Sequence, residues 1–259
     1  MALINLTTLF RGIAPLNNTY SSPVNFRASE KVSAFNFEGL EPNNDRFSTN
    51  PLGGNLKTKA EIEQLAKSNP RITAILKEHN IPLKVNIDAL EKLAKGHLKT
   101  SRIIAAKIYS SLPAELKSEV NLSDLQQAAM LHDYGKVLIP KSILDKNTSL
   151  SPEEKKIMEL HSELGYELLK QQGVNENVLN LVKYHHQKPD GSGYPKADKD
   201  FEYNLGHQIL AVADKYSALT EDRSYHKAFT KGNALNIIFE DVQKGNISRE
   251  VFDALLKSM

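Results

Sequence analysis

Histidine and aspartate residues stand at positions in this sequence where they could hold metal ions together. His132-Asp133 and His185-His186 are tandem polar pairs, each at the end of an apolar stretch with helical spacing. His97 and His161 fall among aliphatic residues on predicted helix faces, and Asp214 lies in a later helical stretch. A lone histidine on an apolar face is usually a satisfied core residue. Several buried without partners would each cost on the order of several kcal/mol, so their number indicates one shared polar site.

The available ligand types restrict the chemistry of such a site. The chain has no cysteine, so a metal ion would have only nitrogen and oxygen ligands. These suit iron, manganese, zinc or similar ions at octahedral or open sites. Asp133 is the natural bridge between two ions, because neighbouring His132 can bind one of them. Two ions roughly 3.5–4 Å apart lower the pKa of a bridging water and clamp a phosphoryl oxygen. Lys136, one turn further on, could neutralise charge on a transferring phosphate, although alone it would be read as a solvated lysine.

The elements that must position these residues are helical from Lys59 onward. Apolar residues recur at helical spacing from Ile87 to Ile108, which predicts one helix with His97 on its inner face. Asn121 or Ser123 is expected to cap a helix that reaches His132-Asp133 and stops at Gly135. Further helices are predicted from Ser151-Pro152-Glu153-Glu154 to Gly173, from Asn175 to His185-His186, from Leu205 to Leu219, near 233–243 and near 248–256. No strand is expected.

Composition divides the chain and excludes some functions. Residues 1–58 are rich in Asn, Ser, Thr, Pro and Gly, and we expect a largely unstructured N-terminal arm there. Residues 59–84 are expected to form a short helical lead-in, and residues 85–259 the functional domain. A net charge of +2 at pH 7 argues against binding to a DNA or RNA polymer. No apolar run approaches the roughly 18 residues that span a bilayer, so we expect no membrane contact and a cytoplasmic protein.

Two stretches of sequence resemble the signatures of a known family. His132-Asp133-Tyr134-Gly135-Lys136 and Asp190-Gly191-Ser192-Gly193-Tyr194-Pro195 are similar to the two motifs of HD-GYP domains, a branch of the HD superfamily of metal phosphohydrolases. The segments 139–144, 161–165 and 213–225 also look like this family and follow in the right order. The resemblance covers roughly residues 85 to 259 and leaves the first 58 residues uncovered.

The resemblance implies a fold, a cofactor and a reaction. Members are multi-helix HD-type bundles that bind divalent metals, commonly iron or manganese, and hydrolyse cyclic di-GMP to pGpG or GMP with metal-activated hydroxide. The metal ligands that it implies are His97, His132, Asp133, His161, His185, His186 and Asp214. Asp133 and Lys136 would be catalytic, with Lys136 at the scissile phosphate and Arg223 near the other phosphate. Gly193, Tyr194 and Pro195 would shape the substrate cleft, and this loop is a candidate contact for a partner protein.

Several residues depart from the family pattern. Leu93 stands where members with a third metal carry Glu, so we expect two metal ions. Gln187 and Gln208 replace a usual Glu and Arg, and we hypothesise that their amides hydrogen-bond to each other. Other replacements, none of them an expected ligand, are Thr100 for Arg, Ser217 for Asp and Ser224 for Pro. His207 is expected to be partly exposed rather than to support the ligands, and His79 and His226 are expected at the surface.

Two other functions stay open at this point. The domain could be an HD-type phosphohydrolase that acts on another cyclic dinucleotide, a nucleotide or a phosphate ester, because metal and cations select phosphate while pocket shape selects the base. It could also be a non-catalytic signalling module that binds a cyclic dinucleotide or a partner, which the replacements at Gln187, Gln208 and Ser217 would favour. The intact ligand set favours an enzyme. A homodimer is left open.

Overall fold

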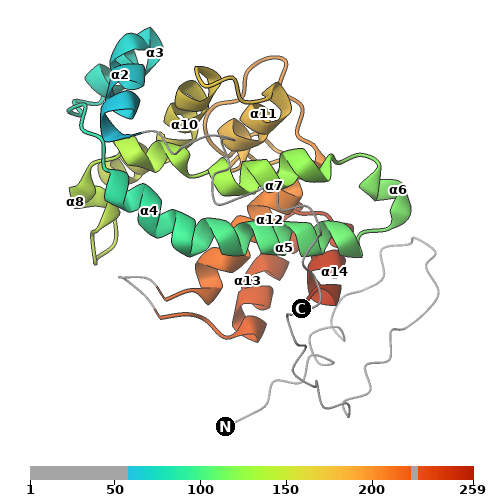
Figure 1. Ribbon diagram of the computed structural model, residues 1–259. Helices are drawn as coiled ribbons and strands as arrows, with labels where there is room; N and C mark the ends of the chain where they lie inside the picture. The colour runs from blue at the N-terminus through green and yellow to red at the C-terminus, as the bar shows by residue number, and fades with distance from the viewer. Residues whose placement is uncertain (1–57, 223–226) are drawn as a thin grey trace, which may run out of the picture. The chain divides into compact units, whose positions relative to one another are not determined.

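The computed structural model describes residues 58–222 and 227–259, which form helices joined by connecting segments (Figure 1). The helices are α2 (Lys59–Ser68), α3 (Pro70–Glu78), α4 (Ile87–Lys95), α5 (His97–Ser111), α6 (Ala114–Lys117), α7 (Leu122–Leu131), the 3₁₀ turn η2 (Tyr134–Leu138), α8 (Lys141–Leu144), α9 (Pro152–Glu159), α10 (His161–Lys170), α11 (Glu176–Tyr184), α12 (Leu205–Thr220), α13 (Lys231–Gln243) and α14 (Arg249–Lys257). Within these residues the only β-pairing is an isolated bridge between His186 and Tyr194. The predicted all-α class is confirmed, while the predicted arm, apart from Thr58, lies outside the described residues.

Local sequence signals decide where the helices begin. The Ser151 hydroxyl accepts a hydrogen bond from the Glu154 backbone N–H, and the Glu154 carboxylate accepts one from the Ser151 backbone N–H. The Asn121 side chain likewise accepts hydrogen bonds from two backbone N–H groups in the first turn of α7. Both arrangements satisfy donors that the start of a helix leaves unpaired. The helix starts predicted at Ser151 and Asn121 are therefore confirmed.

The single helix predicted from Ile87 to Ile108 is wrong, because the chain breaks at Gly96 into α4 and α5. Gly96 has φ −120° and ψ −94°, which lies outside the helical region. Glycine has a low helix propensity, so a break there costs little. Beyond the break, α5 buries the positions that the periodicity predicts, among them Leu98 and Ile108. The break makes His97 the first residue of a helix.

Gly135 does not stop the preceding helix, contrary to the prediction. Helix α7 ends at Leu131, and Gly135 lies inside η2. A Cβ atom on Gly135 would stand 1.9 Å from the His161 carbonyl oxygen and 2.4 Å from the Gly165 backbone nitrogen. Only glycine permits this approach. Gly135 thus brings the turn that contains Asp133 against the start of α10.

Helix α5 is the centre of the bundle. It contacts α7, α12 and α14, and Figure 1 shows α7 running alongside it. The contact faces are apolar and fully buried, with Ala105, Leu125 and Ile209 at 0% exposure. Helix α10 packs against η2 and α11. The bundle therefore brings α5, α7, α10, α11 and α12 around a common interior.

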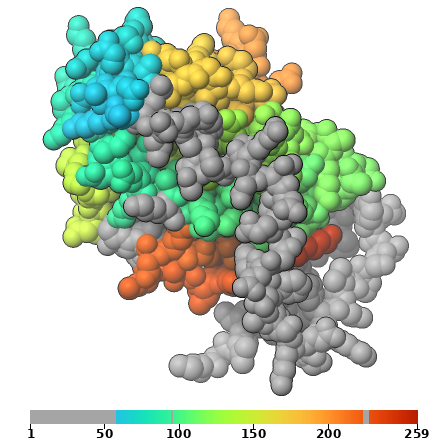
Figure 2. Space-filling view, viewed as in Figure 1, coloured from blue at the N-terminus to red at the C-terminus, as the bar shows by residue number. Residues whose placement is uncertain are grey.

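Helices α2 and α3 lie within residues 59–84, the stretch where a helical lead-in is predicted. They contact α10, and Figure 2 shows their blue surface adjoining the gold surface of α10. Ile62 and Ile72 are buried in the same hydrophobic core as the later helices. The boundary drawn at residue 85 stays a prediction.

Candidate metal centre

The seven side chains predicted as ligands meet at the ends and inner faces of five helical segments. His97 and His161 are the first residues of α5 and α10. His132 and His185 directly follow the ends of α7 and α11, and Asp133 and His186 are the next residues in the chain. Asp214 faces inward from α12. Adjacent side chains inside a helix point roughly 100° apart. At a helix end the chain leaves that geometry, so both members of a tandem pair can face one interior.

The first group of donors consists of His97, His132 and Asp214, here called group 1. One donor atom from each residue lies within 4.8 Å of the other two. Asp214 Oδ1 is 2.9 Å from His97 Nε2 and 3.6 Å from His132 Nε2. The two imidazole rings stand edge to face with centroids 5.4 Å apart. Three donors at these separations can share one cation.

The second group consists of His161, His185 and His186, here called group 2. Their donor atoms also lie within 4.8 Å of one another. His161 Nε2 is 3.3 Å from His185 Nε2, and the rings of His185 and His186 lie 3.9 Å apart at 43°. Group 2 is a purely imidazole set, which suits a divalent transition metal.

The Asp133 carboxylate lies between the two groups. Its Oδ2 atom is 3.6 Å from His132 Nε2 and 3.7 Å from His97 Nε2, both in group 1. Its Oδ1 atom is 3.4 Å from His161 Nε2, in group 2. Lys136 Nζ lies 2.6 Å from Oδ2. Each carboxylate oxygen therefore faces a different group, which is the arrangement that a bridging ligand requires.

Main-chain carbonyls orient three of the imidazoles. The Nδ1 atoms of His132, His161 and His185 lie 3.0, 2.7 and 2.7 Å from the carbonyl oxygens three residues earlier. A carbonyl can only accept a hydrogen bond, so each Nδ1 carries the proton in the neutral ring. Each Nε2 then presents its lone pair to the interior. Ring orientation of this kind is typical of histidines that bind metals.

Burial and neighbouring charges shift the pKa values of the histidine and aspartate side chains in the site. Burial lowers the pKa of His161 and of His186 to about 3, and it holds the pKa of His185 well below its usual value. Burial alone would raise the pKa of Asp133, but the Lys136 ammonium and the surrounding imidazoles hold it well below its usual range. His132 differs, because the Asp133 and Asp214 carboxylates outweigh its burial and raise its pKa. Neutral imidazoles beside an ionised carboxylate, the combination that the low pKa values of group 2 favour, are the protonation states that bind metal.

Several buried nitrogen atoms of this centre lack a favourable hydrogen-bond partner among the described residues. The Nε2 atoms of His97 and His132 are buried and have no partner with hydrogen-bond geometry, although carboxylate oxygens lie nearby. In group 2 the unprotonated Nε2 atoms of His161 and His185 face each other at 3.3 Å. Facing lone pairs and orphaned buried nitrogens are unfavourable without a cation. The residues present therefore fit divalent metal ions.

The predicted substrate loop lies directly over group 2. The Tyr194 ring packs on His186 with centroids 4.6 Å apart, and the Tyr194 backbone N–H donates to the His186 carbonyl at 3.2 Å. A Cβ atom on Gly193 would stand 2.2 Å from that same carbonyl oxygen, so glycine is needed for the approach. The Tyr194–Pro195 peptide bond is cis. The structure thus places Gly193, Tyr194 and Pro195 beside the candidate metal centre.

Gln187 and Gln208 do not hydrogen-bond to each other, so that hypothesis is wrong. The Gln187 amide donates to the Pro195 carbonyl at 2.8 Å and accepts from the Gly193 N–H at 2.8 Å. Gln208 instead accepts from the Ser248 N–H at 2.8 Å. An amide can donate and accept at once, whereas a carboxylate can only accept, which explains how Gln187 holds the loop on both sides.

His207 is not partly exposed, contrary to the expectation. It is fully buried, and its ring lies 5.2 Å from that of Phe201 and 5.5 Å from that of Tyr203. Its position at the start of α12 is covered by the loop that precedes the helix, which the sequence pattern did not reveal. Burial lowers the pKa of His207 to about 4. His79 lies half-buried at the end of α3, whereas Arg223, Ser224 and His226 lie outside the described residues.

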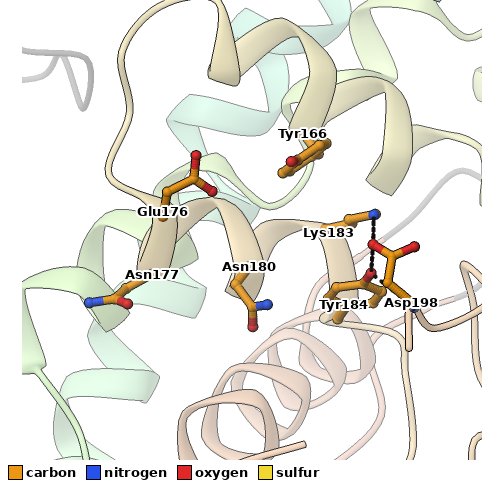
Figure 3. A pocket seen from close by; sticks show the side chains of 7 residues that line it. All are labelled: Tyr166, Glu176, Asn177, Asn180, Lys183, Tyr184 and Asp198. Carbon is orange, nitrogen blue, oxygen red and sulfur yellow. Dashed lines mark hydrogen bonds and ion pairs between the residues drawn. The ribbon is translucent and has the colours of Figure 1, made fainter. Parts of the chain in front are cut away.

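A separate pocket of about 290 Å³ opens beside α10 and α11 (Figure 3). It is lined by Tyr166, Glu176, Asn177, Asn180, Lys183, Tyr184 and Asp198, and none of the predicted ligands belongs to it. Lys183 Nζ and the Tyr184 hydroxyl both point at Asp198 Oδ2, at 2.6 and 2.7 Å. These contacts hold Asp198, in the connection between α11 and α12, against the end of α11. The same connection contains Tyr194.

Two polar residues next to His97 were not predicted to act there. The Ser217 hydroxyl lies 3.0 Å from His97 Nδ1, and it donates to Glu221 Oε1 at 3.0 Å. Ser217 stood out in the sequence only as a replacement, and Glu221 carried no motif. Ser217 follows Asp214 by three residues on one face of α12, and Glu221 is the residue directly after that helix, seven positions from Asp214. This spacing is a signal that could have been used.

The helical fold and the paired donor groups define a domain built around a histidine–aspartate centre that suits divalent metals. A family model described as HD domain matches residues 84–251. That match covers more than half of the chain, and the chain belongs to the HD domain family.

Three curated relatives share part of this sequence. A protein of Thermotoga maritima named "Cyclic di-GMP phosphodiesterase" is 38% identical over 144 residues, which are 54% of this chain and 38% of the relative. The "Cyclic di-GMP phosphodiesterase response regulator RpfG" of Xanthomonas campestris is 36% identical over 144 residues, 54% of this chain and 37% of the relative. The "3'3'-cGAMP-specific phosphodiesterase 3" of Vibrio cholerae is 30% identical over 173 residues, 67% of this chain and 37% of the relative. The matches thus span well under half of each relative.

None of the helices in the described part of the chain combines the length and apolar character needed to cross a membrane.

Proposed function

We propose that this chain is a metal-dependent phosphodiesterase that hydrolyses cyclic di-GMP to pGpG or GMP. The observation that carries the proposal is the position of Asp133, whose two carboxylate oxygens face different groups of histidine ligands. Group 1 and group 2, each completed by Asp133, would hold one divalent ion apiece, iron or manganese. The domain that does this chemistry would comprise residues 85–259.

The residues of the site have distinct roles in this proposal. When bound, two such ions supply Lewis acidity toward the phosphoryl oxygens and acidify water between them. The Nδ1–H···O=C hydrogen bonds keep the imidazoles of His132, His161 and His185 oriented, with the Nε2 lone pair of each neutral ring toward the interior. Lys136, which is mostly buried, keeps a positive charge beside Asp133 and would neutralise charge that develops on the scissile phosphate. Arg223 would contact the other phosphate of a dinucleotide.

The loop over group 2 would bound the substrate cleft. Gly193, Tyr194 and Pro195 are held there by the Gln187 amide, and Tyr194 would present an aromatic surface to a guanine base. The names of two relatives specify cyclic di-GMP, which supports this substrate. A contact between this loop and a partner protein stays a prediction.

A related substrate is the second candidate. One relative is named as specific for 3'3'-cGAMP, in which adenine replaces one guanine. The phosphate chemistry would be the same, so only the pocket around the bases distinguishes the two. A non-catalytic module is less well supported, because all seven predicted ligands lie together in the interior.

The proposed function is tested with the full chain purified without oxygen. The protein is incubated with cyclic di-GMP, 3'3'-cGAMP or bis(4-nitrophenyl) phosphate, and the products are separated by chromatography. We expect cyclic di-GMP to be consumed fastest, with pGpG or GMP as product, and no turnover by Asp133→Ala. Preference for 3'3'-cGAMP would select the second candidate. Binding of cyclic di-GMP without turnover would contradict the enzyme and favour the signalling module.

A further inference from the structure

The connection between α11 and α12 begins with a turn that hydrogen bonds close on itself. The Tyr194 backbone N–H donates to the His186 carbonyl at 3.2 Å. The Gln187 amide accepts from the Gly193 backbone N–H and donates to the Pro195 carbonyl. All of these partners lie between His186 and Pro195, so the bonds fix the internal shape of the turn. The direction in which the chain leaves the turn must be fixed by residues that come after Pro195.

Asp198, three residues after Pro195, attaches the connection to the end of α11. Its Oδ2 atom accepts from the Tyr184 hydroxyl at 2.7 Å and from Lys183 Nζ at 2.6 Å (Figure 3). The Asp198 backbone N–H donates to the same Tyr184 oxygen at 3.3 Å. A tyrosine hydroxyl can donate and accept at once, and here it does both toward one residue. The main chain and the side chain of Asp198 are therefore both held by Tyr184.

Burial shows which of these two partners matters more. The Asp198 side chain is 70% exposed, and an ion pair with so exposed a member, here with Lys183, contributes little. The Tyr184 side chain is buried, and its ring packs on Phe201 with centroids 4.0 Å apart. A hydroxyl on a buried ring cannot easily exchange a lost partner for water, so its hydrogen bonds are costly to break. Tyr184 is also the last residue of α11, directly before His185 of group 2.

We propose that Asp198 is a positioning residue: through the Tyr184 hydroxyl, it holds the turn against the end of α11 and keeps Tyr194 in place for the substrate. The inference rests on the proposed function, in which Tyr194 bounds the substrate cleft. A loop that is already ordered loses less conformational entropy when a ligand binds. Loss of the attachment at Asp198 therefore weakens substrate binding and leaves the groups that contact the scissile phosphate intact.

The first test compares KM and kcat for cyclic di-GMP among variants of the full chain purified without oxygen. We expect Tyr184→Phe and Asp198→Ala each to raise KM roughly 2- to 10-fold, the effect of one typical hydrogen bond, with kcat nearly unchanged. Tyr184→Phe keeps the ring and removes only the hydroxyl. Asp198→Asn keeps an oxygen acceptor and should stay close to wild type. The matched control is Asp200→Ala, the same change at an exposed residue of the connection.

Two kinetic results would overturn the proposal. One is a wild-type KM in both Tyr184→Phe and Asp198→Ala. The other is a loss confined to kcat, because that would place the effect on the chemical step rather than on substrate binding.

The second test observes Tyr194 without catalysis, by ¹⁹F NMR of the metal-free full chain labelled with 3-fluorotyrosine. The Tyr194 signal is identified by its loss in Tyr194→Phe. We expect Asp198→Ala to move this signal toward its position in the urea-unfolded chain, while Asp198→Asn and Asp200→Ala leave it unchanged. An unchanged Tyr194 signal in Asp198→Ala would overturn the proposal. If the wild-type chain neither binds nor hydrolyses cyclic di-GMP while the signal still depends on Asp198, the proposed function fails and the positioning of Tyr194 by Asp198 is supported.

Discussion

At the scale of single residues, Asp133 is the side chain that lies between group 1 and group 2. Its charge survives burial because Lys136 and the surrounding rings hold its pKa well below the usual range. Removing one partner from such a buried set leaves an uncompensated charge, which is costly. Metal ions would satisfy the same carboxylate and the orphaned Nε2 atoms together. The site is therefore assembled for cations rather than for internal hydrogen bonding.

Lys136 tests the catalytic assignment separately from metal binding. We expect Lys136→Ala to keep its metal ions but to lower turnover of cyclic di-GMP by about 10²-fold or more, because a positive charge at the developing phosphate charge is lost. Metal content and single-turnover rates measure the two effects. Lys141→Ala, a change at an exposed lysine outside the site, is the control. Wild-type turnover in Lys136→Ala would remove this residue from the mechanism.

Much of the site at this scale could be predicted from sequence. The pairs His132-Asp133 and His185-His186 stand out because polar pairs at the ends of apolar helices need partners. The contact between His97 and Ser217 could not be predicted, because these residues lie 120 positions apart and no local pattern links them. The Gln187 contacts were mispredicted because an amide can bond to loop backbone as readily as to another side chain.

At the scale of helices, the helix ends position four of the predicted ligands. His97 and His161 start helices, and His132 and His185 follow helix ends. Capping residues and apolar periodicity predicted helix ends near His132 and His185, because both are local properties of the chain. The helix starts at His97 and His161 were missed, since the predicted helices from Ile87 to Ile108 and from Ser151 to Gly173 each divide in two, at Gly96 and at Leu160. Gly96 and Gly135 were harder, since a glycine can end a helix, interrupt it or permit close contact. The structure shows an interruption at Gly96 and a close contact at Gly135.

The close contact at Gly135 gives a prediction about stability. We expect Gly135→Ala to lower the free energy of unfolding by about 1–3 kcal/mol or more, because the new methyl group would collide with the His161 carbonyl. Gly232→Ala in α13, where a Cβ meets nothing within 4 Å, should be neutral or slightly stabilising. Urea titration measures both variants. Equal stability of Gly135→Ala and wild type would contradict the described approach of η2 to α10.

At the scale of the whole molecule, residues 58–222 and 227–259 form a helical bundle whose interior contains a polar cluster. Its class could be predicted because helical periodicity runs through nearly all of the described chain. The order in which the helices surround the site could not, since it depends on contacts such as those of α5 with α12 that are distant in sequence. Burying several neutral imidazoles makes the stability of the fold depend on pH.

The metal-free protein should lose stability in acid. His161 and His186 have pKa values of about 3 in the folded state against an ordinary value of 6.5. Between these values the unfolded chain binds protons that the folded chain does not, so unfolding becomes more favourable as the pH falls below about 6.5. Each such histidine contributes up to about 1.4 kcal/mol per pH unit in that window. Urea titrations of chelator-treated protein between pH 7.5 and pH 5 measure the slope, and His161→Gln/His186→Gln should flatten it. A stability that rises on acidification would contradict the buried neutral imidazoles.

The most direct test of the central claim is the metal content of the full chain purified without oxygen, compared between wild type and Asp133→Ala. The account predicts two divalent ions per wild-type chain and a loss of one or both in Asp133→Ala, with the helical circular dichroism signal unchanged. A wild-type chain that takes up no iron or manganese, or an Asp133→Ala chain with the full complement, would contradict it.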